Sequence, residues 1–88
     1  MPVVMSELQG KIKAAIRGAV NGNVEIEETP VGNVHVFAWS ETFIGLSESA
    51  RDRLVWPALE RSLSEDELIR ISVCVLSTPE EHETLTGT

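Results

Sequence analysis

Hydrophobic residues recur with two different periods along this chain, and the order of those periods limits the folds that it can adopt. A stripe at i, i+4 spacing predicts an amphipathic helix over Glu7–Asn21, capped by Ser6 together with Gln9. Residues 23–29 then alternate valine and isoleucine with glutamate, and Val34–Trp39 alternate again. Both segments are typical of strands. The short link between them predicts an antiparallel hairpin.

A second helical pattern follows the hairpin. Ser49 and Asp52 have the spacing of a helix start, and an apolar stripe continues from there to Leu63. Pro57 lies inside this pattern. Because proline lacks a backbone donor and its ring crowds the preceding turn, we expect it to kink or divide the helix near residues 55–56.

The last elements complete a recognisable order. Ser64 and Glu67 form a capping box for a single turn, and the β-branched run Ile69–Leu76 predicts a buried third strand. A helical crossover makes the second and third strands parallel. We therefore expect an α+β, two-layer sandwich with a three-stranded mixed sheet and both helices on one face. One domain should span residues 1–82, followed by a polar, disordered tail over 83–88.

The second strand leaves an alternative open. Its side chains His35, Phe37 and Trp39 share one face. If that face meets the helices, they form the bulky half of the core, which is the interpretation we favour. If it faces away, nothing in this chain should cover it, and they form an exposed aromatic strip suited to a partner or to stacked bases. Cys74, among valines, is expected to be a small buried hydrophobe.

Composition sets the broad class of the protein. The net charge is −7, which argues against non-specific binding to nucleic acid or anionic lipid. No apolar run approaches the roughly 18 residues that a membrane helix needs, so we expect no membrane association. A single cysteine and the absence of a signal-peptide pattern favour the cytoplasm. Six basic residues nevertheless cluster in two segments and could form a local basic face: Lys11, Lys13, Arg17, Arg51, Arg53 and Arg61.

Two arginines near the start of the second helix are predicted to have different roles. At 100° per residue, Arg51 falls on the buried stripe with Val55 and Leu59, whereas Arg53 points roughly opposite, into solvent. We expect the stem of Arg51 to pack on the sheet edge and its guanidinium to bind carbonyls or a carboxylate. Arg53, with Arg70, is the better candidate for contact with a partner.

The same region carries a family resemblance. The stretch "FIGLSESARDRLVWPALERSL" resembles the central signature of BolA-like proteins: Phe43, Gly45, the Arg51-x-Arg53 pair, two apolar positions and the aromatic Trp56, then leucines. The stretch "STPEE", Ser77–Glu81, resembles the motif after that family's last strand. The resemblance spans roughly residues 7–82 and implies the KH-like helix–strand–strand–helix–strand fold.

The resemblance implies one of two functions. BolA-like proteins are partners of monothiol glutaredoxins in iron–sulfur homeostasis, where histidine or cysteine side chains in the hairpin loop and at the third strand bind a shared [2Fe-2S] cluster. Others are bacterial transcriptional regulators that bind DNA. This sequence has Asn33 and Arg70 at the two ligand positions. Because arginine stays protonated and offers no lone pair, we expect no intrinsic cofactor and no change of cluster ligation in a complex. His35 and Cys74 are the remaining candidate metal ligands, and we expect neither to bind.

The sequence contains no pattern typical of an enzyme site. It lacks a nucleophile–base pair, a phosphate-binding glycine loop and metal-ligand spacing. The GxxG loop of nucleic-acid-binding KH domains is missing too. We therefore expect a non-enzymatic interaction module that binds a monothiol glutaredoxin-type protein. The alternatives are a KH-like nucleic-acid-binding regulator that uses the six basic residues, and a diverged paralogue with neither activity.

Overall fold

Within residues 3–85, three strands and four α-helices follow one another in the order that the hydrophobic periods predict, with one helix added at the end. The computed structural model describes residues 3–85. Its elements are α1 (Met5–Ala19), β1 (Asn23–Glu28), β2 (Val34–Trp39), the 3₁₀ helix η1 (Glu41–Phe43), α2 (Glu48–Ser62), α3 (Glu65–Leu68), β3 (Ile71–Ser77) and α4 (Pro79–Leu85). The sheet order is β1-β2-β3, with β1 antiparallel to β2 and β2 parallel to β3. The α+β class, the element order and the mixed sheet are confirmed.

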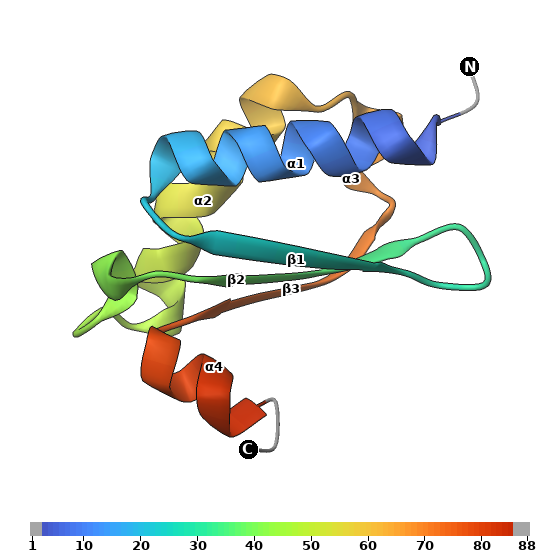
Figure 1. Cartoon of the computed structure of the whole chain (residues 1–88). Helices are drawn as coiled ribbons and strands as arrows, with labels where there is room; N and C mark the ends of the chain where they lie inside the picture. The colour runs from blue at the N-terminus through green and yellow to red at the C-terminus, as the bar shows by residue number, and fades with distance from the viewer. Residues whose placement is uncertain (1–2, 86–88) are drawn as a thin grey trace.

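Helices α1 and α2 pack side by side against one face of the sheet, as Figure 1 shows. From β2, Val34, Val36 and Ala38 point into this interface and are buried. The helices contribute one apolar stripe each, so that the core lies between the two layers. Its other main members are Leu8, Ile12, Ile16, Phe43, Val55 and Leu59. None of the helices in residues 3–85 has the length and apolar character needed to cross a bilayer.

Both long helices begin earlier than predicted. Helix α1 starts at Met5, after Val4, which makes no side-chain cap, so Ser6 lies within the first turn and its predicted capping box does not form. The partly buried Met5 packs against the core, which favours the earlier start. Helix α2 is capped by Ser47, whose hydroxyl accepts a hydrogen bond from the Ala50 amide at 3.2 Å. The predicted cap at Ser49 is therefore wrong.

Pro57 does not divide α2, so that part of the expectation is wrong. The helix is assigned without a break from Glu48 to Ser62. Proline removes one backbone hydrogen bond, while Val55 and Leu59 on either side of it are fully buried and hold both halves against the core. The predicted capping box of α3 is confirmed, with Ser64 and Glu67 bonded to each other's backbone amides.

The third strand is less buried than its β-branched sequence predicts. It lies at the edge of the sheet, begins at Ile71 rather than Ile69, and leaves Ser72 and Val73 exposed. An edge strand has one neighbouring strand rather than two, so its side chains are less completely covered. Its pairing with β2 is parallel, as expected, and shifts register once, between Val34 and His35.

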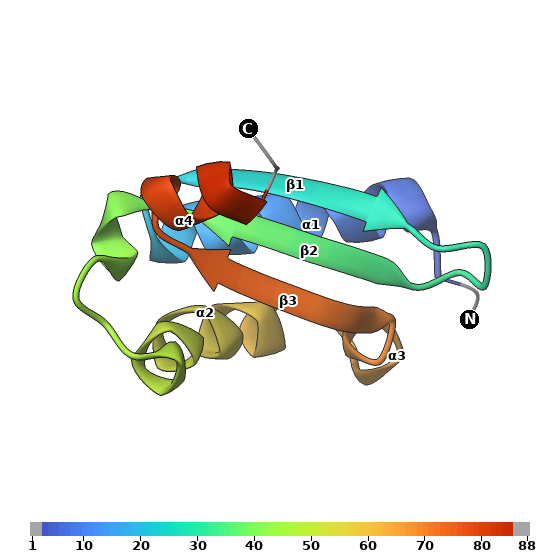
Figure 2. The ribbon, with the colours of Figure 1, turned by 90° about the horizontal axis from the view of Figure 1, so that it is seen from below.

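Helix α4 is absent from the sequence-based prediction, which assigned disorder to residues 83–88. Residues 83–85 are the end of this helix, and 86–88 lie outside the described residues. Figures 1 and 2 show α4 on the face of the sheet opposite α1 and α2, over one end of the strands. The two predicted helices, α1 and α2, share one face as expected, and the unpredicted α4 lies on the other. The ring of His82 stacks on Trp39, with centroids 3.5 Å apart and planes 6° apart.

Candidate functional site

Arg51 has the structural role predicted for it. Its side chain is 11% exposed. Nε donates to the carbonyl of Leu46 at 3.1 Å, and Nη1 donates to the carbonyl of Leu76 at 3.0 Å and to Oε1 of Glu81 at 2.7 Å. The guanidinium also lies 5.9 Å from the ring centroid of Phe43, within cation–π range. A single side chain thus joins α2, the end of β3 and α4.

The contact with Leu76 also covers part of an open sheet edge. In a parallel ladder, alternate residues direct their backbone groups to the two sides of the strand. The Ser77 carbonyl accepts from Ser40 just beyond β2, so the Leu76 carbonyl faces the free edge. Arg51 occupies that position. A charged side chain on an edge strand is a common means of preventing unwanted strand pairing.

The carboxylate of Glu81 is held in its charged form. The backbone amide of Thr78 donates to its Oε1 at 2.8 Å, and Arg51 donates to the same oxygen. These hydrogen bonds, with the Thr78 amide the larger cause, lower the pKa of Glu81 below its ordinary value. Glu81 in turn donates its own amide to the Thr78 hydroxyl at 3.2 Å. Thr78 and Glu81 therefore form a capping box for α4, a signal that the sequence analysis missed.

Two other residues of the stretch that resembles the BolA-like signature have clear roles in the fold. Phe43 is fully buried and belongs to the core. Gly45 has φ of +79°, a left-handed conformation that costs other residues energy. The link between β2 and α2 therefore needs glycine at this point, and it brings Arg51 to the sheet edge.

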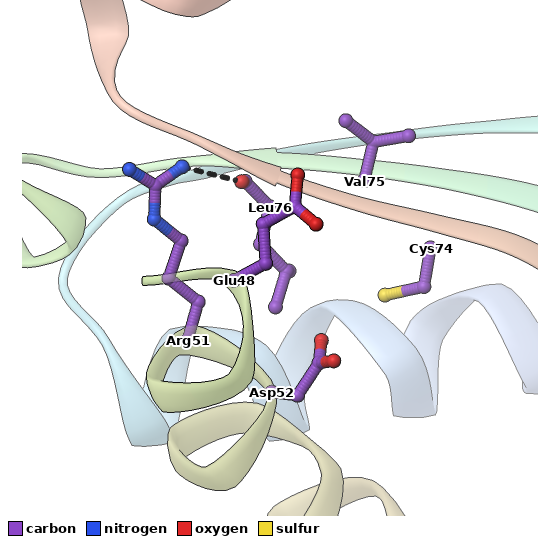
Figure 3. Close-up of a pocket in the computed structure, with 6 residues that line it drawn as sticks. All are labelled: Glu48, Arg51, Asp52, Cys74, Val75 and Leu76. Atoms are coloured by element: carbon purple, nitrogen blue, oxygen red, sulfur yellow. Dashed lines mark hydrogen bonds between the residues drawn. The ribbon is translucent and has the colours of Figure 1, made fainter. Parts of the chain in front are cut away.

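A small pocket of about 220 Å³ lies between the start of α2 and β3. Figure 3 shows its lining, with Cys74 and Val75 pointing to opposite sides of β3 and Asp52 directed toward the thiol. Burial, and to a lesser degree the negative charge of Asp52, raise the pKa of Cys74 to about 12. A protonated, half-buried thiol is a poor nucleophile and a poor metal ligand, which agrees with the packing role expected for it.

The aromatic face of β2 turns away from the core, so the favoured interpretation of His35, Phe37 and Trp39 was wrong. The three side chains alternate with the buried residues of β2 and are partly exposed. Both faces of this strand are hydrophobic, and the smaller side chains face α1 and α2. Trp39 is covered by α4 through the stacked ring of His82.

Arg70 lies beside the turn of the hairpin. Its carbonyl accepts from the Val34 amide at 2.8 Å, and a Cβ added to Gly32 would stand 3.6 Å from its Nη1. Gly32 has φ of +82° and closes the turn by donating to the Thr29 carbonyl at 3.1 Å. The two positions at which the resemblance places cluster ligands are therefore adjacent in space. Asn33 and Arg70 occupy them.

This end of the sheet has an unusual surface, which we call the hairpin–Arg70 patch: Val31, Gly32, Asn33, Ile69 and Arg70. Val31 is 76% exposed and Ile69 is 73% exposed. The Nε atom of Arg70 is buried and has no hydrogen-bond partner among the described residues. A buried donor without a partner is uncommon in folded proteins and calls for an explanation.

The predicted basic residues are not equally available. Lys11 donates to both carboxylate oxygens of Glu67, at 3.0 and 3.2 Å, and Arg51 is bonded as described. The Ser64 amide, which is the larger cause, and Lys11 lower the pKa of Glu67. Lys11, Arg17, Arg53 and Arg61 are exposed, and Lys13 is partly buried. Arg53 lies near the start of α2, whereas Arg70 precedes β3 beside the hairpin turn.

Comparisons with known proteins leave the family open. No family model, curated protein or solved structure matches this chain. Among residues 3–85, no group of three or more His, Cys, Asp or Glu side chains is arranged to hold a metal ion. What this end of the sheet offers chemically is an arginine donor together with exposed apolar side chains.

Proposed function

We propose that this protein is a non-enzymatic, BolA-like interaction module whose partner is a monothiol glutaredoxin-type protein. The observation that carries the proposal is the position of Arg70 beside the hairpin turn. This is the end of the sheet where the resemblance implies that a glutaredoxin docks. The roles of Phe43, Gly45 and Arg51 in the fold support the resemblance, because each signature residue has a structural reason to be there.

The hairpin–Arg70 patch has the composition of a small protein interface. Exposed Val31 and Ile69 offer apolar area, and arginine is enriched where partners bind. The Arg70 guanidinium can donate to a carboxylate or carbonyl of the partner, which would also satisfy its buried Nε. The patch is small, so we expect a transient complex rather than a permanent one.

The complex should form without exchange of cluster ligands. Arg70 and Asn33 cannot replace histidine at iron. The raised pKa of Cys74 keeps its thiol protonated, and His35 lies within β2 rather than at the turn. A partly buried, unpaired cysteine is also compatible with the reducing cytoplasm, which we propose as the compartment.

The experiment is a calorimetric titration of this protein with a monothiol glutaredoxin. We expect micromolar binding that Arg70→Glu weakens by at least tenfold, because charge reversal removes the donor and adds repulsion. Arg17→Glu makes the same change of charge at an exposed position of α1, and it should leave the affinity within about twofold of the unmodified protein's. Absence of binding, or equal losses in the two variants, would contradict the proposal and would favour a diverged paralogue.

A nucleic-acid interface has less support. Two of the six basic residues, Lys11 and Arg51, are already paired with carboxylates. The aromatic face of β2 could stack bases, but Trp39 is covered by His82. The net charge of −7 opposes phosphate binding as well.

A further inference from the structure

The sheet has a second surface that α1 and α2 leave uncovered. On the face opposite these helices, the register places three rows of side chains across the strands. The first row, Asn23, Trp39 and Ser77, lies under α4. The second is Glu25, Phe37 and Val75, and the third is Glu27, His35 and Val73. In Figure 2 the strands continue uncovered beyond α4. We call the second and third rows the outer face.

Acidic side chains lie along one margin of the outer face, and apolar side chains lie across the rest of it. Glu25 and Glu27 on β1 are exposed, and neither carboxylate forms a hydrogen bond or an ion pair with another described residue. On the opposite side, Val73 of β3 is 39% exposed, and Phe37 lies between the two margins. Leu85 of α4 is 63% exposed and lines a hollow of about 300 Å³ with Phe37 and the two glutamates.

We propose that the outer face binds an amphipathic helix of a protein partner, with basic residues along one margin. A helix is the element that packs on a sheet face, and α4 already does so at one end. The two free rows are roughly 7 Å apart along the strands, which is comparable with the width of a single helix, about 10 Å across with its side chains. Its apolar stripe would meet Phe37, Val75 and Val73, and its lysines or arginines would meet Glu25 and Glu27.

Other occupants fit the outer face less well. In a symmetric dimer of this chain, the same acidic margin would be presented by both copies, each with a net charge of −7. Single-stranded nucleic acid needs accessible aromatic rings and a positive groove. Here the Trp39 ring is stacked against His82, and two carboxylates with no ion pair to another residue of 3–85 lie beside Phe37. The charge therefore favours a basic partner.

The test uses the whole protein, labelled with ¹⁵N, and a synthetic helical peptide of about 15 residues with a leucine stripe and lysines along one margin. We expect the peptide to shift the backbone amide signals of Glu25, Glu27, Phe37 and Val75. A matched peptide with glutamate in place of lysine should bind at least tenfold more weakly.

Two double variants distinguish binding of the peptide at the outer face from general attraction of a basic peptide to an acidic protein. Glu25→Lys with Glu27→Lys should weaken peptide binding about tenfold, whereas Glu65→Lys with Asp66→Lys on α3 should change it less than twofold. Equal losses in the two double variants would overturn the proposal. Shifts confined to amides elsewhere would do the same, as would stronger shifts of the outer-face amides by an oligouridine. Because no glutaredoxin is present, the outcome is independent of the proposed function.

Discussion

The Nη1 atom of Arg51 lies within hydrogen-bond distance of both the Leu76 carbonyl, at 3.0 Å, and the Glu81 carboxylate, at 2.7 Å. The guanidinium therefore links α2 to the end of β3, and it links α4 to both of these elements. Arg51→Ala would leave the Leu76 carbonyl at the sheet edge without its donor. We expect the free energy of unfolding to fall by about 2–3 kcal/mol, the range for a lost charged hydrogen-bond donor.

The measurement for Arg51 is urea denaturation followed by circular dichroism. Arg51→Lys should lose nearly as much stability as Arg51→Ala, because one ammonium group cannot reproduce the planar geometry of these bonds. Arg53→Ala, two positions along the same helix and exposed, should change stability by no more than about 0.5 kcal/mol. Equal effects at the two arginines would show that the contacts of Arg51 are not important for the fold.

Glu67 should make stability depend on pH. Hydrogen bonds from the Ser64 amide and Lys11 lower its pKa in the folded protein. Because the folded pKa lies below the unfolded value of about 4.3, the associated stability is fully present above that value. It is lost as pH falls through the folded pKa. Urea unfolding between pH 6 and pH 3 should therefore show a shallower decline for Glu67→Gln than for Glu65→Gln. Identical declines would contradict the assignment.

Cys74 should be unreactive in the folded protein. Burial and Asp52 raise its pKa to about 12, so almost no thiolate exists near pH 8. We expect iodoacetamide to modify the folded protein at least about 100-fold more slowly than the urea-unfolded chain at the same pH. Mass spectrometry over time gives both rates. Comparable rates would mean that the thiol is accessible and charged, and Cys74 would become a candidate ligand.

Patterns within short segments of the sequence correctly predicted the elements whose structure depends on neighbouring residues. The alternation of Val34–Trp39 gave the bounds of β2, and the Ser64–Glu67 spacing identified α3. Helical geometry also separated Arg51 from Arg53. In each case, the pattern that decides the structure lies within a single segment of the chain.

The remaining features depend on contacts between distant segments. The stacking of His82 on Trp39 and the Arg51–Glu81 pair hold α4 in place, and a polar seven-residue helix has no apolar stripe to reveal it. The Thr78–Glu81 capping box was the one local signal available. The sequence could not show which face of β2 meets the core, because both faces carry hydrophobic side chains. The buried Nε of Arg70, which lacks a hydrogen-bond partner within the described part of the chain, could not be inferred before the hairpin turn was placed beside it.

The most direct test of the account is to add this protein to a monothiol glutaredoxin that carries its [2Fe-2S] cluster. Visible circular dichroism reports the cluster ligands, and size-exclusion chromatography reports the complex. We predict that a complex forms while the cluster spectrum stays unchanged, since Arg70 and Asn33 offer no ligand. Arg70→His should introduce part of a ligand-exchange change. The contrary result is a ligand-exchange spectrum with the unmodified protein that disappears in His35→Ala or Cys74→Ser.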